Sequence, residues 1–203
     1  MKMRNVAAAA ILAAGTMAVQ AAPVQWTAAS GGNDHWYEYI QTAETWQDAK
    51  AAAQGRIFHT LRGYLATVMS QDEFNFIRTV TTNLIWIGGS DESGEGVWRW
   101  VTGPATEQGQ IFYDTSDPTA TTFAPWNGGE PNDCCGGEDY LQMNWDTSTG
   151  AWNDHGGPAN ASQVNGYLVE YGEVFAEVPE PGHLALLAVS LAGLGITLQR
   201  RKR

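Results

Sequence analysis

The segment most informative about the fold is Glu130-Pro131-Asn132-Asp133-Cys134-Cys135-Gly136-Gly137-Glu138, together with Trp152-Asn153-Asp154 further downstream. Five side chains with oxygen ligands lie in these two stretches: Glu130, Asn132, Glu138, Asn153 and Asp154. Hard cations such as Ca2+ take about six to eight oxygen ligands, chiefly carboxylates and carbonyls. Because this set combines three carboxylates with two amides, it predicts a calcium site with room for further ligands: water, backbone or the hydroxyls of a sugar.

The same residues resemble the principal calcium and sugar site of C-type lectin domains. In that family a Glu-Pro-Asn tripeptide, a Glu eight positions after the first Glu, and a later Trp-Asn-Asp supply the ligands. The resemblance therefore implies that the five residues above hold calcium and that Pro131 follows a cis peptide bond. Glu-Pro-Asn, as opposed to Gln-Pro-Asp, implies mannose-type sugars, which carry equatorial 3- and 4-hydroxyls.

The implied mechanism is coordination of a sugar by the bound ion. Two vicinal hydroxyls complete the ion's coordination shell. Glu130 and Glu138 accept hydrogen bonds from those hydroxyls, whereas Asn132 and Asn153 donate to their lone pairs. Asp154 chiefly binds the ion.

An acidic segment further upstream predicts a second set of ligands. Ser90-Asp91-Glu92-Ser93-Gly94-Glu95-Gly96 resembles the family segment that supplies an auxiliary calcium site together with the Asp after Glu-Pro-Asn. The resemblance implies Asp91, Glu95 and Asp133 as auxiliary ligands, with Glu138 available to both sites. The residue types leave an acidic hairpin turn open as the alternative.

The resemblance covers residues 33–172 and implies an α+β class, the C-type lectin-like fold. That fold has two helices, small antiparallel sheets and a long calcium-binding loop region. The matching segments are 33–39 as the first strand, 45–50 as the first helix, 86–89 as the core strand, 98–100 as the strand after it, and 166–170 as the closing strand. About 150 residues between the two ends of the chain suit one domain with its own core.

Local patterns give bounds for the two helices. Trp46, Ala49 and Ala53 share one face of a helix that we expect from Thr42 to about Gln54. Ser70-Gln71-Asp72-Glu73 is a capping box, which predicts the start of a second helix.

The remaining elements are predicted from composition. A short buried strand is expected over 84–87, ended by Gly88-Gly89. Residues 102–166 are dense in Gly, Pro, Asn, Asp and Thr, so we expect mostly loop, and a loop of that length is usually functional. Most of the nine Trp lie in apolar or strand-like settings, which indicates core packing.

Cysteine is where the chain departs from the family pattern. Positions expected to hold the family's disulfide cysteines are Ala53, Tyr140 and Val169, and the two cysteines of the chain are the neighbours Cys134 and Cys135. Neighbouring Cα atoms lie about 3.8 Å apart, closer than the ~4.4–6.8 Å that disulfides prefer. A vicinal bridge, free thiols and an intermolecular bridge all remain open. In each case we expect packing and metal to hold the core.

The N-terminus predicts export. Residues 1–21 read as a secretory signal peptide, with a basic start at Lys2 and Arg4, an apolar run over 6–18 and a small-residue cleavage site at Val19-Gln20-Ala21. The alternative is a buried N-terminal helix.

The C-terminus predicts a second targeting signal. A linker over 173–183 contains Pro179-Glu180-Pro181, and a short apolar transmembrane segment over 184–198 precedes a basic cytoplasmic tail over 199–203. This order resembles the bacterial PEP-CTERM sorting signal, which implies transient membrane anchoring and then processing by an exosortase. The alternative is a permanent single-span anchor. Either way, the lectin-like domain over 22–172 is expected in the cell envelope or outside the cell.

Charge excludes some partners. All 22 acidic residues and only five basic residues lie between the two targeting segments, which gives that part a formal charge of −17. Such a surface repels nucleic acid and anionic lipid heads, so we expect no nucleic-acid partner.

The sequence therefore predicts an exported, calcium-dependent protein that binds a mannose-type glycan or exopolysaccharide. The alternative is a calcium-ordered protein-binding or matrix-structural module without sugar binding. Glu130 and Glu138 also resemble a glycosidase pair, but they lie in a polar loop where a cation keeps both ionised, so we expect no enzyme. His155 follows Asp154, so it could line the sugar site, but we expect a solvated loop residue.

Overall fold

The computed structural model describes residues 21–117, 119 and 121–174. The elements in chain order are β1 (Val24–Gln25), a short 3-10 helix (Ala28–Ser30), β2 (Trp36–Ile40), β3 (Glu44–Thr45), α1 (Trp46–Gln54), β4 (Ile57–Phe58), β5 (Leu61–Leu65), α2 (Gln71–Val80), β6 (Ile85–Ser90), β7 (Val97–Trp100), β8 (Ile111–Asp114), β9 (Tyr140–Met143), β10 (Asn153–His155), β11 (Gln163–Val164) and β12 (Tyr167–Val174).

The targeting segments expected at the two ends lie almost entirely outside the described residues. They are 1–20 of the signal peptide, 175–183 of the linker, the apolar segment 184–198 and the tail 199–203. Among the residues that are described, no helix combines the length and the apolar composition that a membrane crossing requires. Strand β12 continues to Val174, two residues past the expected domain end at 172.

Side-chain caps fix where both helices begin. Helix α1 starts at Trp46, not at Thr42 as expected, because Thr45 is its N-cap and accepts a hydrogen bond from Asp48 N at 3.2 Å. The residues before it are extended because β3 pairs with β11. Helix α2 follows Ser70, whose Oγ accepts from Glu73 N at 3.2 Å, as the capping box predicts.

Strand β6 runs through the two glycines that were expected to end it. A Cβ at Gly88 would lie 1.8 Å from Thr102 Oγ1, and one at Gly89 would lie 2.7 Å from Leu141 Cδ2. The glycines are therefore needed for close packing inside the strand, and the expectation that they end it was wrong.

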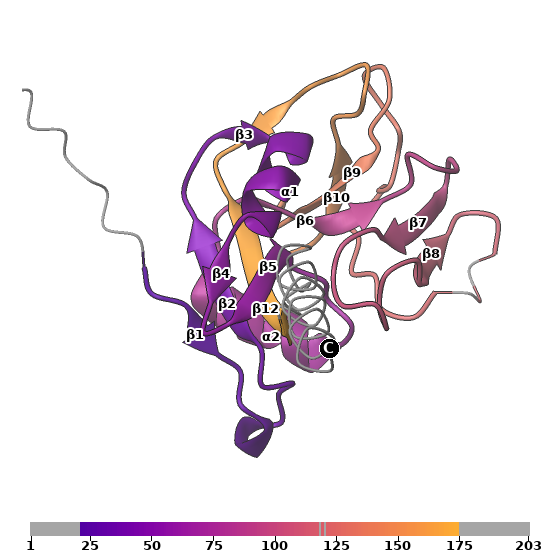
Figure 1. The fold of residues 1–203 in the computed structure, drawn as a ribbon. Helices are drawn as coiled ribbons and strands as arrows, with labels where there is room; N and C mark the ends of the chain where they lie inside the picture. The colour runs from indigo at the N-terminus through magenta and orange to yellow at the C-terminus, as the bar shows by residue number, and fades with distance from the viewer. Residues whose placement is uncertain (1–20, 118, 120, 175–203) are drawn as a thin grey trace, which may run out of the picture.

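Ten strands form one connected sheet. Its main path is β1-β2-β12-β6-β7-β8, with β5 and β4 attached beside β12, and β9 and β10 attached beside β6. The pairing of β12 with β6 is parallel, and the other pairings are antiparallel. Figure 1 shows β7 and β8 across the molecule from β2 and β4. The α+β class with two helices is confirmed.

Residues 102–166 contain more structure than expected. Strands β8, β9, β10 and β11 all lie in this stretch. All four residues of β9 are buried, and β9 pairs with β6 on one side and β10 on the other. Composition alone hides these strands because each is short and flanked by turn residues.

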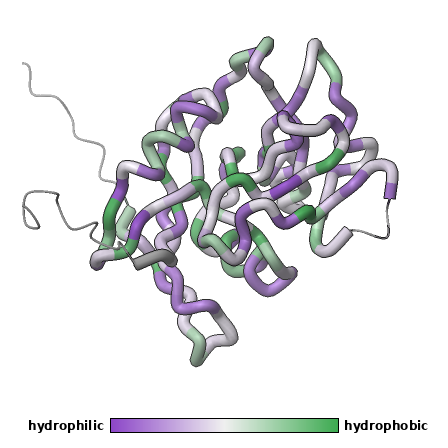
Figure 2. Tube along the Cα trace, turned by 45° about the vertical axis from the view of Figure 1, so that its right-hand side comes forward, coloured by the Kyte–Doolittle hydropathy of each residue, from purple (hydrophilic) through white to green (hydrophobic). Residues whose placement is uncertain are grey.

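The core is aromatic and falls into two clusters. One surrounds Trp98, Trp100 and Trp152, and the other surrounds Trp46 and Trp86. Six of the nine tryptophans are buried, so core packing was predicted correctly for most of them. Figure 2 shows hydrophobic stretches alternating with hydrophilic ones along the chain.

The three positions where the family's cysteines were expected are filled by packing. Ala53 and Val169 are fully buried, and Tyr140 is 2% exposed. All three belong to the cluster around Trp46. Because a buried aromatic or branched side chain contributes about 1.5–3 kcal/mol, packing can substitute for these disulfides in part.

Candidate functional site

Two segments far apart in the sequence are joined just before their candidate ligand residues. Trp126 forms a parallel bridge with Trp152, and Asn127 N donates to Trp152 O at 2.8 Å. Trp152 is fully buried and packs edge-on against Trp100 and Phe112. The rigid core therefore positions the Glu-Pro-Asn loop beside the Trp-Asn-Asp strand, β10.

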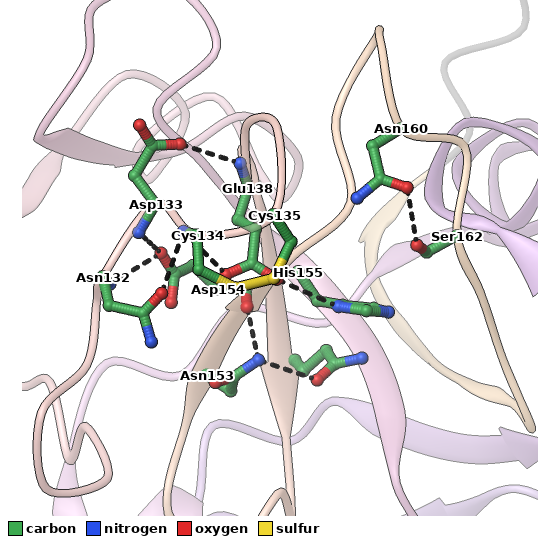
Figure 3. The surroundings of a disulfide bond; sticks show 11 residues. Asn132, Asp133, Cys134, Cys135, Glu138, Asn153, Asp154, His155, Asn160 and Ser162 are labelled. Carbon is green, nitrogen blue, oxygen red and sulfur yellow. Dashed lines mark hydrogen bonds and ion pairs between the residues drawn. A yellow bond between two sulfur atoms is a disulfide. The ribbon is translucent and has the colours of Figure 1, made fainter.

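Asp154 ties the two segments together at the site. Its Oδ2 accepts hydrogen bonds from Asn132 N at 2.9 Å and Asp133 N at 2.8 Å, as Figure 3 shows. The Glu130-Pro131 bond is cis, in agreement with the resemblance. Asp154 is 1% exposed, so its charge is held inside the loop rather than in solvent.

Two carboxylate oxygens of the site are buried without a donor. They are Glu130 Oε2 and Asp154 Oδ1, and no hydrogen-bond donor among the described residues reaches either atom. A buried carboxylate oxygen without a partner is costly, because its desolvation is not compensated. A cation between these side chains removes that cost.

The electrostatics of the site favour uptake of positive charge. Burial, the neighbouring Asp154 carboxylate and the charge of Glu138 together raise the pKa of Glu130 to about 7. Burial also raises the pKa of Glu138, partly offset by His155. These carboxylates therefore share either a proton or a cation. The expectation that both glutamates are ionised depends on a cation being bound.

The two amides of the predicted set are placed differently. Asn132 is exposed, and its Oδ1 accepts from Cys134 N at 2.9 Å. Asn153 is buried, and its Nδ2 donates to Gln142 Oε1 at 3.2 Å and to Asp154 O. The amide hydrogens of Asn153 are thus used within the protein, which favours a role as ion ligand over donation to a sugar. Its carbonyl oxygen remains suited to an ion.

His155 is part of the site, and the expectation of a solvated loop residue was wrong. It lies on β10, its Nδ1 is 3.2 Å from Glu138 Oε1, and its ring stacks on Trp86 with centroids 5.8 Å apart. The signal in the sequence was its place directly after Asp154 on a strand.

Cys134 and Cys135 form a disulfide with each other. Their Cα atoms lie 3.8 Å apart, and both residues are exposed. Of the three alternatives that the sequence left open, the vicinal bridge is the one observed. Figure 3 shows the bridge among Asn132, Glu138 and Asp154.

The upstream acidic segment converges with Asp139. One carboxylate oxygen from each of Asp91, Glu95 and Asp139 lies within 4.8 Å of the other two. Asp133, expected in this set, lies outside the triad, and its Oδ1 accepts from Glu138 N at 3.0 Å. Asp139 was missed, although its position directly after Glu138 was a usable signal.

The same segment is also a hairpin turn. Gly94 N donates to Asp91 O at 2.7 Å, and Gly96 N donates to Asp91 Oδ2 at 2.9 Å. Asp91 Oδ1 is buried without a donor among the described residues, and burial raises the pKa of Asp91 to about 7, with Glu95 and Asp139 adding to the rise. The turn and the converging acids are therefore compatible.

Both groups of residues fit a hard cation. Each combines carboxylates and each contains an oxygen that is buried and lacks a donor. Oxygen-only ligand sets with several carboxylates are typical of calcium rather than of softer metals.

Comparisons with known proteins confirm the C-type lectin-like fold. The family model for the Lectin C-type domain matches residues 42–166. Over 140 residues the chain is 41% identical to Halomucin from Haloquadratum walsbyi, which covers 68% of this chain but 1% of Halomucin. It is 36% identical over 131 residues to Lectin BRA-3 from Megabalanus rosa, covering 61% of this chain and 69% of that protein.

Among solved structures, the chain is similar to the mouse scavenger receptor C-type lectin carbohydrate-recognition domain. The TM-score is 0.52 at 20% identity, and the match covers 70% of this chain and 93% of that one. At this identity the likeness shows the fold alone.

Proposed function

Because this chain belongs to the C-type lectin domain family, we propose that it binds carbohydrate through a calcium ion held by its two joined loops. The ligands are Glu130, Asn132, Glu138, Asn153 and Asp154. The observation that carries this proposal is the pair of buried oxygens without donors, Glu130 Oε2 and Asp154 Oδ1. The family homologues support the carbohydrate-binding role.

The residues of the site have different roles toward the ion and the sugar. The ion, when bound, supplies a positive centre to which two neighbouring sugar hydroxyls coordinate. Glu130 and Glu138 accept hydrogen bonds from those hydroxyls, and the exposed Asn132 donates from Nδ2. The buried Asn153 and Asp154 face the ion. This assignment keeps the expected roles of four residues and leaves Asn153 as an ion ligand without its expected role as sugar donor.

Binding rather than catalysis suits the glutamate pair. The raised pKa of Glu130 follows from burial and from neighbouring carboxylates, and a bound cation reverses the effect of those neighbours by favouring the ionised form. A single exposed sugar site gives weak affinity, so several copies on one surface strengthen attachment to a polysaccharide.

We propose mannose-type specificity, which rests on Glu130 and Asn132 as acceptor and donor. The double substitution Glu130→Gln with Asn132→Asp exchanges donor and acceptor while keeping charge and oxygen count. Mannose binding should weaken by about tenfold or more, because one good charge-assisted hydrogen bond contributes about 1.5–3 kcal/mol. Competition for a mannose column by free mannose and free galactose measures this. Unchanged preference for mannose in the double variant would show that other residues select the sugar.

We propose that the chain is exported and that its C-terminal segment is removed by an exosortase. The support is the order of Pro179-Glu180-Pro181, an apolar stretch and a basic tail. Mature protein recovered from the cell surface or medium should then lack residues 184–203. Intact-mass measurement checks this, and a species that retains Arg203 would indicate a permanent anchor instead.

A further inference from the structure

The Cys134–Cys135 disulfide lies inside the proposed principal calcium site. Both cysteines are exposed, and they sit between the ligand residues Asn132 and Glu138 in the chain. Figure 3 shows the bridge beside the side chains of Asn132, Glu138 and Asp154. A disulfide between neighbours closes no long loop, so it does little to restrict the unfolded chain as a whole.

One backbone group links this bridge to two ligands. Cys134 N donates to Asn132 Oδ1 at 2.9 Å and to Glu138 Oε2 at 3.2 Å. The carbonyl on the other side of the same residue accepts from Gly137 N at 3.2 Å. The orientation of the Cys134 backbone therefore sets where two of the ligand side chains point.

The loop also adopts backbone conformations that a free chain visits rarely. Asp133 has φ of 47° and Cys135 has φ of 63°. Non-glycine residues at positive φ are uncommon and need support from their surroundings. The ring closed by the two sulfurs removes torsional freedom at both cysteines and so supplies such support.

We propose that the Cys134–Cys135 disulfide is a positioning element of the principal calcium site, which orders Asn132 and Glu138 before the ion arrives. This inference rests on the proposed function, since it requires an ion at these ligands. Without the bridge, the free energy needed to order the loop is subtracted from the free energy of calcium binding. Ordering one residue corresponds to about five- to thirtyfold in an equilibrium constant, so we expect calcium affinity to fall by about tenfold.

Reduction opens the bridge by thiol–disulfide exchange. A dithiol attacks one exposed sulfur, the S–S bond breaks, and the dithiol closes to its own cyclic disulfide. Two electrons and two protons pass from the dithiol to the cysteines, which become two thiols.

The test compares oxidised full-length protein, protein reduced with dithiothreitol, and the variant Cys134→Ser with Cys135→Ser. The readout is the calcium concentration for half-maximal retention on a mannose column, which reports the principal site. Reduced protein and the variant should each need about tenfold more calcium, and reductant should not change the variant further. The melting temperature in EDTA should be the same for all three, because a bridge with a merely structural role would shift it.

The possible results distinguish failure of the positioning role from failure of the proposed lectin function. Equal calcium requirements in oxidised and reduced protein overturn the positioning role and leave the lectin proposal standing. A lower melting temperature in EDTA with an unchanged calcium requirement also overturns the positioning role and leaves the lectin proposal standing. Failure of the oxidised protein to bind mannose at any calcium concentration overturns both.

Discussion

Protein in excess calcium should unfold at a clearly higher temperature than the same protein in EDTA. The proposed ligands come from a loop and a strand that meet only in the folded chain, so an ion that binds them binds the native state and not the unfolded one. At a calcium concentration one hundred times the dissociation constant, the free energy of unfolding should rise by about 2.7 kcal/mol. Thermal melts followed by tryptophan fluorescence measure this.

Two variants, one inside the proposed site and one outside it, test whether the Glu130 carboxylate causes the rise in melting temperature. Glu130→Gln removes one carboxylate and should reduce the calcium-induced rise in melting temperature. Asp117→Asn, on an exposed turn after β8, should leave it unchanged. Superimposable melts with millimolar calcium and with EDTA would remove the metal hypothesis.

The stability of the ion-free protein should fall as pH rises. The folded-state pKa of Glu130 is raised from 4.5 to about 7, and that of Asp91 from 3.8 to about 7. Burial also raises the pKa of Glu73 on α2 to about 8, with the charge of Glu170 adding to it. A group with a raised pKa contributes stability below its unfolded value and loses that contribution as pH passes through the folded value.

In EDTA, the free energy of unfolding from urea titration should therefore decrease between about pH 5 and pH 8. Excess calcium should weaken or reverse that trend, because the ion binds the ionised carboxylates of Glu130 and Asp91. Glu73 lies outside both candidate sites, so Glu73→Gln should lessen the pH dependence in EDTA without changing the calcium effect at pH 8. A slope of opposite sign in EDTA would contradict the electrostatic picture of the site.

Chemistry that acts over a few residues was predictable from the sequence. The capping residue Ser70 fixes the start of α2, and the spacing of Glu130 and Glu138 identified the candidate site. The hydrogen bonds from Asn132 N and Asp133 N to Asp154 were not predicted, because they join residues 22 and 21 positions apart in the sequence.

Features that depend on distant partners were not predictable. Helix α1 starts late because β3, which includes Thr45, pairs with β11, a strand far along the sequence. Gly88 sits inside a strand because Thr102 packs against it. Asp139 joins the acidic triad because Asp91 N donates to Asp139 O at 3.3 Å, which holds two distant segments of the chain together. Each outcome is decided by tertiary contact, which local pattern does not encode.

Asp154→Asn should abolish retention on a mannose column in calcium. Asparagine keeps an oxygen that can accept from Asn132 N and Asp133 N, so the loop can retain its hydrogen bonds. It removes a negative charge that is 1% exposed and the buried Oδ1 that faces no donor. Because calcium affinity depends strongly on ligand charge, the dissociation constant should rise by about a hundredfold. Calcium titration and column retention measure the two effects.

Asn153→Ala provides a second test of the same strand. It removes a neutral ligand, so retention should also be lost, although the calcium dissociation constant should rise less than for Asp154→Asn. Asp146→Asn is the matched control, because Asp146 accepts hydrogen bonds from Ser148 in a separate turn. That control should bind mannose as the parent chain does. If Asp154→Asn folds normally and its retention on mannose is unchanged, the sugar site lies elsewhere on the domain.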